Sequence, residues 1–138
     1  MLAPKVFIII PVHNRREITL ACLGKLRETG VLANFQVVVV DDGSTDGTAV
    51  GIEHNYPEVK ILYGDGNLWW AGAIAVGMQY ALDQKAEYIF WLNDDCFPQG
   101  NCLSKMLEFL QERHMAVVGA RCLEKSSQAP IPTGSQKR

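Results

Sequence analysis

The chain has 138 residues, of which 48% are hydrophobic and 20% charged, and its 13 basic and 15 acidic side chains give a formal net charge of −2. This length suits one domain with a sizeable core and argues against intrinsic disorder over most of the chain. Binding to nucleic acid or to an anionic membrane needs a concentrated positive patch, so the near-neutral charge without a Lys/Arg run predicts that nucleic acid is not a partner.

The first part of the chain predicts a strand, a helix and a second strand. Val6–Ile10 and Val37–Val40 are continuous β-branched runs, which is typical of strands buried on both faces of a parallel sheet. The helix between them is predicted from apolar residues at helical spacing and a glycine stop: Ile18, Cys22, Leu23, Leu26 and Gly30.

A second helix and a third strand are predicted next. The helix should begin at Ser44 or Thr45, both good N-caps, and run to Asn55, because Pro57 marks its end. Val59–Tyr63 is the third strand.

The remaining elements continue the alternation. We predict a helix over Ala71–Leu82, a strand over Tyr88–Leu92, a helix over Leu103–Leu110 and a short fifth strand at Val117–Val118. The apolar side of the first of these helices is Ile74, Met78, Ala81 and Leu82. Residues 124–138 are rich in Ser, Gln, Pro and Lys without an apolar period, so we expect a domain over residues 1–123 followed by a polar, frayed tail.

Strict alternation of strands and helices predicts an α/β fold, a three-layer sandwich with a mostly parallel sheet and right-handed crossovers. Ligands of such sheets bind beyond the carboxyl ends of the strands. The candidate site is therefore built from the polar segments that follow the four main strands, namely residues 11–14, 41–46, 64–67 and 93–95.

Two pairs of adjacent carboxylates stand at this edge. Asp94 and Asp95 offer the hard oxygen ligands that Mg²⁺ or Mn²⁺ prefers, and a diphosphate would fill the other positions of the metal. The alternative is a polar turn after a strand. Asp41 and Asp42 are equally compatible with turn and cap chemistry, but a carboxylate here could also accept the imide N–H of a pyrimidine base.

The segment after the third strand allows close approach to a ligand but does not predict a dinucleotide site. Asn67, Gly72 and Ala73 are small or polar enough for the backbone to approach a ribose or a diphosphate. Trp69 occupies the place of the third glycine of a dinucleotide fingerprint, which argues against NAD. Trp69 and Trp70 are more readily explained by core or rim packing than as a sugar platform.

Cysteines and histidines give no metal-site spacing. The four cysteines form no C-x-x-C pair, so we expect reduced and mostly buried thiols, and no zinc site. No apolar run approaches the roughly 20 residues of a membrane span, and the N-terminus lacks the pattern of a signal peptide. We therefore expect a soluble, cytoplasmic protein.

Four segments occur in an order and spacing that resemble the motifs of family 2 glycosyltransferases with the GT-A fold, most closely the rhamnosyltransferase-like members. The segments are Ile8–Arg15, Val39–Thr48, Asn67–Gly77 and Trp91–Asp95. The similarity covers residues 5 to about 120. It implies a nucleotide-diphospho-sugar-transferase fold of which the chain carries the N-terminal, nucleotide-sugar-binding half.

The resemblance also implies roles for single residues. Pro11, His13 and Asn14 would line the base and ribose pocket, and Asp42 would hold a uracil or thymine ring with Asp41 beside it.

The segment 93–95 stands where the family has its D-x-D motif, but Asn93 replaces the first acid. Asp95 is then the metal ligand, with Asp94 as a ribose or second metal contact, and Mg²⁺ or Mn²⁺ is the implied cofactor. Many relatives also carry an arginine after the third strand, where this chain has residues 71–73.

The implied function is the donor-binding domain of an inverting glycosyltransferase of hexosyl or rhamnosyl type in polysaccharide biosynthesis. It would transfer a sugar from UDP or dTDP to a glycan or lipid-linked acceptor, at the inner face of a membrane through its partners. The family's catalytic base follows the strand expected at Val117–Val118, so we expect it beyond Arg138 and expect this chain to be inactive alone, with a separate acceptor-binding half or a second copy as partner.

Two other functions compete with this interpretation. The chain could be a non-catalytic nucleotide-binding module or a fragment of a split enzyme. A phospho-acceptor receiver domain would suit the length, but it needs an acidic pair after the first strand, where Pro11 and Val12 stand.

Overall fold

The structure is a computed structural model that describes residues 2–123. The chain divides into two compact units, residues 1–98 and residues 99–138. The predicted domain boundary at residue 123 coincides with the end of the described residues, and the predicted tail over 124–138 lies outside them; both stay predictions.

The first unit contains a parallel sheet of four strands. The strands are β1 (Val6–Val12), β2 (Gln36–Asp41), β3 (Lys60–Tyr63) and β4 (Tyr88–Trp91), in the order β3-β2-β1-β4. All three pairings are parallel, and Ile9 stands opposite Val38 on one side and Trp91 on the other. The predicted α/β fold with a parallel sheet is confirmed.

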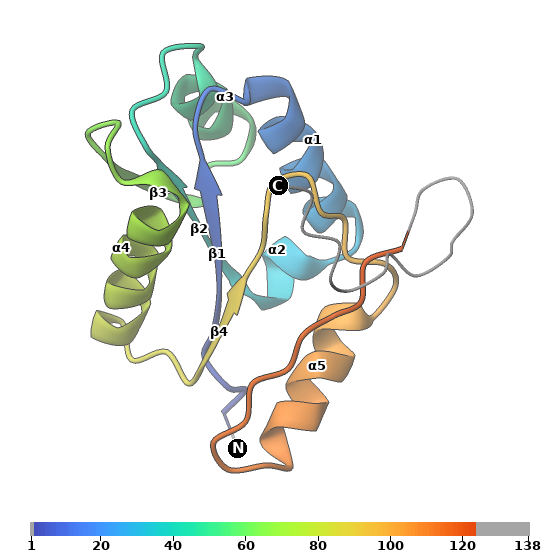
Figure 1. Ribbon diagram of the computed structural model, residues 1–138. Coiled ribbons are helices and arrows are strands. Elements are labelled where there is room, and N and C mark those ends of the chain that lie inside the picture. The colour runs from blue at the N-terminus through green and yellow to red at the C-terminus, as the bar shows by residue number, and fades with distance from the viewer. Residues whose placement is uncertain (1, 124–138) are drawn as a thin grey trace. The chain divides into compact units, whose positions relative to one another are not determined.

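Helices cover both faces of this sheet, as the continuous β-branched strands require. The helices of the first unit are α1 (Arg16–Glu28), α2 (Val31–Asn34), α3 (Thr48–Asn55) and α4 (Trp69–Asp83). Helix α4 covers one face, and the other three lie on the opposite face (Figure 1). The second unit contributes α5 (Cys102–Gln111).

The face under α4 is closely packed. Its buried cluster consists of Phe7, Ile9, Val38, Val40, Ala73, Ile74 and Ala81. A Cβ atom added at Gly77 would overlap Ile9 Cγ2 and lie 3.2 Å from Val40 Cγ2, so the glycine lets α4 approach the sheet. Leu82, predicted on this buried side, is instead half exposed.

Helix α1 buries a polar residue where an apolar one was predicted. Cys22, Leu23 and Leu26 are buried as expected, but Ile18 is 41% exposed and Thr19 is fully buried. The Thr19 hydroxyl donates to Asp94 Oδ2 at 3.1 Å, so this hydrogen bond compensates for burying the polar group.

The start of α3 was predicted too early. The helix begins at Thr48, because the Asp46 carboxylate accepts the Thr48 backbone N–H at 3.0 Å. The backbone N–H groups of Ser44 and Thr45 donate instead to the side chains of Asp41 and Asn14, so this segment is a hydrogen-bonded loop.

Two further expectations were wrong. No strand forms over residues 116–122, and Val117 is fully exposed, so the predicted fifth strand at Val117–Val118 gains no burial from β-branched side chains. The cysteines were expected to be mostly buried, but only Cys22 is buried, whereas Cys96 and Cys102 are partly exposed and Cys122 is exposed. Among residues 2–123, no helix combines the length and apolar character needed to cross a membrane.

Candidate functional site

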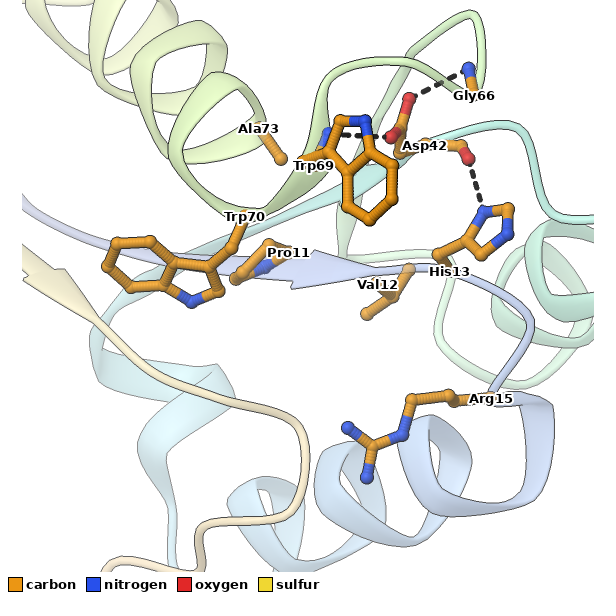
Figure 2. Close-up of a pocket in the computed structure, with 9 residues that line it drawn as sticks. All are labelled: Pro11, Val12, His13, Arg15, Asp42, Gly66, Trp69, Trp70 and Ala73. Atoms are coloured by element: carbon orange, nitrogen blue, oxygen red, sulfur yellow. Dashed lines mark hydrogen bonds between the residues drawn. The ribbon is translucent and has the colours of Figure 1, made fainter. Parts of the chain in front are cut away.

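A pocket of about 380 Å³ opens beyond the carboxyl ends of β1 and β2. It is lined by Pro11, Val12, His13, Arg15, Asp42, Gly66, Trp69, Trp70 and Ala73. These residues come from the end of β1, the loops after β1, β2 and β3, and the start of α4 (Figure 2). The pocket therefore lies where ligands of parallel α/β sheets bind.

The sheet order explains why the segments after β1 and β4 meet. The chain proceeds from β1 through β2 to β3 on one side, and β4 then pairs with β1 on the other side. Residues 13–15 and 93–95 consequently follow β1 and β4, the two neighbouring strands at which the order of the strands along the chain changes direction.

The Asp42 carboxylate accepts hydrogen bonds from the backbone at both of its oxygens. Its Oδ1 accepts the Gly66 backbone N–H at 2.8 Å, and its Oδ2 accepts the Trp69 backbone N–H at 3.0 Å. Asp42 thus ties the end of β2 to the loop between β3 and α4, and it is buried.

These hydrogen bonds determine the charge of Asp42. Burial alone, the largest single influence, would raise its pKa, but the backbone N–H groups of Trp69, Leu68 and Gly66 and the nearby His13 together lower the pKa below 3.8. The carboxylate is therefore ionised near neutral pH and acts only as a hydrogen-bond acceptor.

Local backbone geometry makes the close approach to Asp42 possible. A Cβ atom at Gly64 would lie 2.5 Å from Asp42 Oδ1, so only a glycine fits there. Gly66 has φ +92°, which favours glycine, but Trp69 also has φ +55° at the start of α4. A tryptophan in the left-handed region is uncommon, and here its N–H is held by Asp42.

His13 is fixed in one tautomer by its neighbours. The Asp42 carbonyl oxygen lies 2.5 Å from His13 Nδ1 and can only accept, so Nδ1 carries the proton. His13 Nε2 then accepts from Asn14 Nδ2 at 3.2 Å. The ring is positioned at the pocket wall (Figure 2).

Asn14 and Asp41 stabilise the loop after β2 through hydrogen bonds and are not among the residues that line the pocket. Asn14 Oδ1 accepts the Thr45 N–H at 2.7 Å, and Asp41 Oδ1 accepts the Ser44 N–H at 3.0 Å. Asn14 also has φ +49°, a conformation that asparagine tolerates better than most residues.

Arg15 connects the pocket to the acidic pair after β4. Its Nη1 lies 2.9 Å from Asp94 Oδ1, and its Nη2 lies 3.3 Å from Asp95 Oδ2. Asp94 is buried, whereas the Asp95 side chain is 54% exposed. One guanidinium therefore neutralises part of the charge of two adjacent carboxylates.

The two acids differ in environment. Burial, the largest influence, raises the pKa of Asp94, although the Arg15 charge and the Thr19 hydrogen bond oppose that change. Asp95 keeps open access to a ligand on its exposed side.

Trp70 and Asn93 form the rim beside this acidic pair. Trp70 Nε1 donates to Asn93 Oδ1 at 2.9 Å, and the Trp70 ring meets Trp91 edge to face with centroids 5.9 Å apart. Trp70 packs at the rim as expected, but the Trp69 indole stands 80% exposed at the pocket (Figure 2).

The structure brings together only some of the candidate residues. Pro11, His13 and Asp42 line the pocket. The other candidates lie at the end of β2 (Asp41), on α4 (Gly72) or on the adjoining loops (Asn14, Asn67, Asp94 and Asp95), and their binding roles stay predictions. Arg15 and Trp69 are pocket residues to which the sequence analysis gave no binding role, since it explained Trp69 by core or rim packing.

Asp94 and Asp95 fit a divalent cation only if phosphate oxygens and water supply its other ligands. Residues 2–123 contain no group of three or more His, Cys, Asp or Glu side chains that could hold a metal ion. Mg²⁺ and Mn²⁺ need only one or two carboxylates when phosphate oxygens and water complete the coordination. The exposed Asp95 carboxylate fits that requirement, and Asp94 fits it only after release from Arg15.

Comparison with known proteins gives a consistent family match. The profile of Glycosyl transferase family 2 matches residues 7–136. An uncharacterized glycosyltransferase of Haemophilus influenzae is 28% identical over 97% of this chain, which covers 54% of that protein. Glycosyltransferase AglE of Haloferax volcanii is 28% identical over 84% of the chain, which covers 38% of it. The chain thus spans about half the length, or less, of these relatives.

Solved structures share the fold. TarS from S. aureus in complex with UDP-GlcNAc superposes with a TM-score of 0.68 at 24% identity, over 88% of this chain and 37% of the other. A mannosyltransferase from Pyrobaculum calidifontis in complex with GDP-Man and Mn²⁺ gives a TM-score of 0.67 at 22% identity, over 79% of this chain and 33% of the other. The fold of residues 2–98 is that of these glycosyltransferases.

Proposed function

Because the chain belongs to glycosyl transferase family 2, we propose that it is the donor-binding part of an inverting glycosyltransferase that takes a UDP- or dTDP-sugar. The observation that carries this proposal is the ionised, buried Asp42 carboxylate in the pocket, with the exposed Trp69 ring beside it.

Asp42 supports recognition of a pyrimidine base. Each of its oxygens already accepts one backbone N–H and retains a second lone pair. An ionised acceptor suits the imide N–H of uracil or thymine, and the His13 ring lies at the same wall. Trp69 offers an aromatic face on which the base can stack.

The other end of the pocket suits the diphosphate. Arg15 lines the pocket, and Asp95 stands beyond it with an exposed carboxylate. A divalent cation held by Asp95 would neutralise the negative charge of the departing nucleoside diphosphate. Asp94 remains the candidate for a ribose or second metal contact.

The proposed transfer inverts the anomeric carbon. The acceptor hydroxyl oxygen bonds to that carbon while the bond to the diphosphate oxygen breaks, and a general base takes the hydroxyl proton. The acceptor is proposed to be a glycan or a lipid-linked sugar, bound by a separate half or by a second copy of this chain.

Calorimetry tests donor binding directly. We expect UDP and dTDP to bind more tightly with Mn²⁺ than with a chelator, and GDP to bind less tightly than either. Equal affinity with and without the metal would remove the cation from the proposal. Tighter binding of GDP would reject the pyrimidine assignment.

Two variants separate the roles of the acids. Asp95→Ala should abolish the metal effect but keep residual nucleoside binding. Asp42→Ala should weaken binding of uridine itself, because the base loses a charge-assisted hydrogen bond. Asp65→Ala is the matched control, since this exposed carboxylate accepts the nearby Asn67 N–H and does not line the pocket. Identical behaviour of the first two variants would contradict this division.

A non-catalytic nucleotide-binding module is the second candidate function. The observation that favours it is that Asp41, Asp42 and Asp94 are all buried and hydrogen-bonded, so none of them is free to act as a general base. Nucleotide binding without turnover in any assembly of the chain would support this candidate.

A further inference from the structure

We propose that Arg15 is an internal counter-ion that competes with a divalent cation for Asp94 and Asp95, and that a bound nucleotide diphosphate releases it. The inference rests on the proposed function, because it assigns a positioning role within the same donor site. Because Arg15 occupies the two carboxylates until a nucleotide releases it, we expect the cation and the nucleotide to bind together, without prior binding of the cation.

The distances between Arg15 and the two carboxylates support its role as their counter-ion. The two terminal nitrogens of Arg15 lie 2.9 Å from Asp94 Oδ1 and 3.3 Å from Asp95 Oδ2, so one planar guanidinium spans both carboxylates. Any cation approaching these oxygens meets a positive charge already in place, and the repulsion opposes its binding.

The sequence of the cluster favours the same conclusion. Asn93 stands next to the pair and accepts a hydrogen bond from Trp70 Nε1, and its neutral amide contributes no charge. Two carboxylates and one guanidinium leave a formal charge of −1 to attract a divalent cation. Removal of the Arg15 charge would leave the two carboxylates with a formal charge of −2.

Release of Arg15 need not leave Asp94 without a partner. Thr19, one turn further along α1, donates its hydroxyl to the other oxygen of Asp94 at 3.1 Å. The Thr19 hydroxyl thus holds the buried carboxylate while the guanidinium moves.

The pocket provides a destination for the guanidinium. Arg15 lines the same pocket as Asp42 and Trp69, and its side chain is 39% exposed (Figure 2). A diphosphate in this pocket offers anionic oxygens that match the planar donors of arginine. Transfer of Arg15 to these oxygens would free Asp95 for the cation.

Mn²⁺ binding to the whole 138-residue chain, followed by electron paramagnetic resonance of free Mn²⁺, tests the proposal without any activity assay. In the absence of nucleotide, Arg15→Gln should bind Mn²⁺ about three- to tenfold more tightly than the unmodified chain, a modest gain because the ion pairs are partly exposed. Arg16→Gln is the matched control, because the Arg16 guanidinium forms its ion pair within residues 2–123 with the exposed Glu17. It should leave Mn²⁺ affinity unchanged.

A second measurement uses UDP as the nucleotide. Saturating UDP should tighten Mn²⁺ binding to the unmodified chain by a larger factor than binding to Arg15→Gln, because the variant has no guanidinium to release. Should Arg15→Gln not fold by circular dichroism, Arg15→Lys replaces it, and a smaller gain in Mn²⁺ affinity is expected because an ammonium cannot span both acids.

Equal Mn²⁺ affinity of the arginine variant and the unmodified chain, or no Mn²⁺ binding to either, would overturn the counter-ion role. The proposed function fails separately, if UDP and dTDP bind to none of the chains with or without Mn²⁺. A gain in Mn²⁺ affinity together with no nucleotide binding would support the counter-ion and reject the donor site.

Discussion

Asp42 Oδ2 accepts the backbone N–H of Trp69 at 3.0 Å, so a carboxylate at the end of β2 holds the first residue of α4. Trp69 has φ +55°, which costs energy for a side chain with a Cβ atom. The hydrogen bond opposes that cost and keeps the indole at the pocket, 80% exposed. Asp42 therefore acts on the pocket both through its own charge and through the aromatic ring that it positions.

The lowered pKa of Asp42 predicts a pH dependence of stability. Burial, taken alone, would raise this pKa, but the backbone N–H donors lower it below 3.8. The folded chain binds this proton less readily than the unfolded chain, so the stabilisation is fully present above 3.8 and is lost as the pH falls through the lower folded pKa. Urea midpoints at pH 7, 5 and 3 should be similar at the first two values and reduced at the third.

Asp42→Asn identifies the contribution of this residue. The variant should show lower stability at pH 7 and a smaller loss between pH 5 and 3. A residual loss is expected from Asp46, whose pKa is lowered by the Thr48 hydroxyl. Asp65→Asn, a substitution of an exposed acid on the loop after β3, should retain the full loss. An unchanged pH dependence in Asp42→Asn would contradict the prediction.

The exposed ring of Trp69 predicts an aromatic contribution to nucleotide binding. Trp69→Ala should weaken UDP binding about five- to 150-fold, which corresponds to the usual strength of base–aromatic stacking, and Trp69→Phe should retain most of the affinity. Titration calorimetry measures both. Tyr63→Ala removes another exposed aromatic ring, outside the pocket, and should leave UDP affinity unchanged. Equal losses in Trp69→Ala and Tyr63→Ala would show a general effect on folding.

Much of the fold follows from local sequence patterns. Continuous β-branched runs such as residues 37–40 predict buried parallel strands, because burial on both faces leaves no polar alternation. The start of α3 was missed for a physical reason: the side chains of Asp41, Asn14 and Asp46 accept backbone N–H groups that are not adjacent to them in sequence, and these bonds hold residues 44–47 as a loop before the helix. Good capping residues alone do not reveal which acceptor they will meet.

The site was predictable in its location but only in part in its residues. Strand ends of a parallel sheet meet at one edge, and this rule placed Pro11, His13 and Asp42 at the pocket. Arg15 was missed because its partners lie about eighty positions away in sequence. The signal was the excess of carboxylates at that edge, which required a nearby positive charge.

Burial predicts an unreactive thiol at Cys22. Desolvation, followed by the charges of Asp94, Cys96 and Asp95, raises its pKa to about 12, so at pH 8 only about one molecule in ten thousand carries the thiolate. Iodoacetamide should modify the exposed Cys122 quickly and Cys22 only after unfolding in urea. Peptide mass spectrometry after timed quenching measures each site. Equal native rates at the two cysteines would contradict the buried position of Cys22.

We predict that this chain alone does not transfer sugar at a useful rate. The buried acids of the strand ends, Asp41, Asp42 and Asp94, each accept hydrogen bonds from groups of the chain, and Asp95 is assigned to the cation. None of these four carboxylates is thus left to deprotonate an acceptor, and a general base typically contributes about 10²–10⁴-fold in rate. Incubation with labelled UDP- and dTDP-sugars, Mn²⁺ and a panel of glycan and lipid-linked acceptors should give at most slow donor hydrolysis, with water in place of the acceptor. Asp95→Ala measures the background, because hydrolysis that depends on the cation should disappear in it. Efficient transfer with inversion, abolished by replacing one acidic residue of the chain, would show instead that these 138 residues carry their own base.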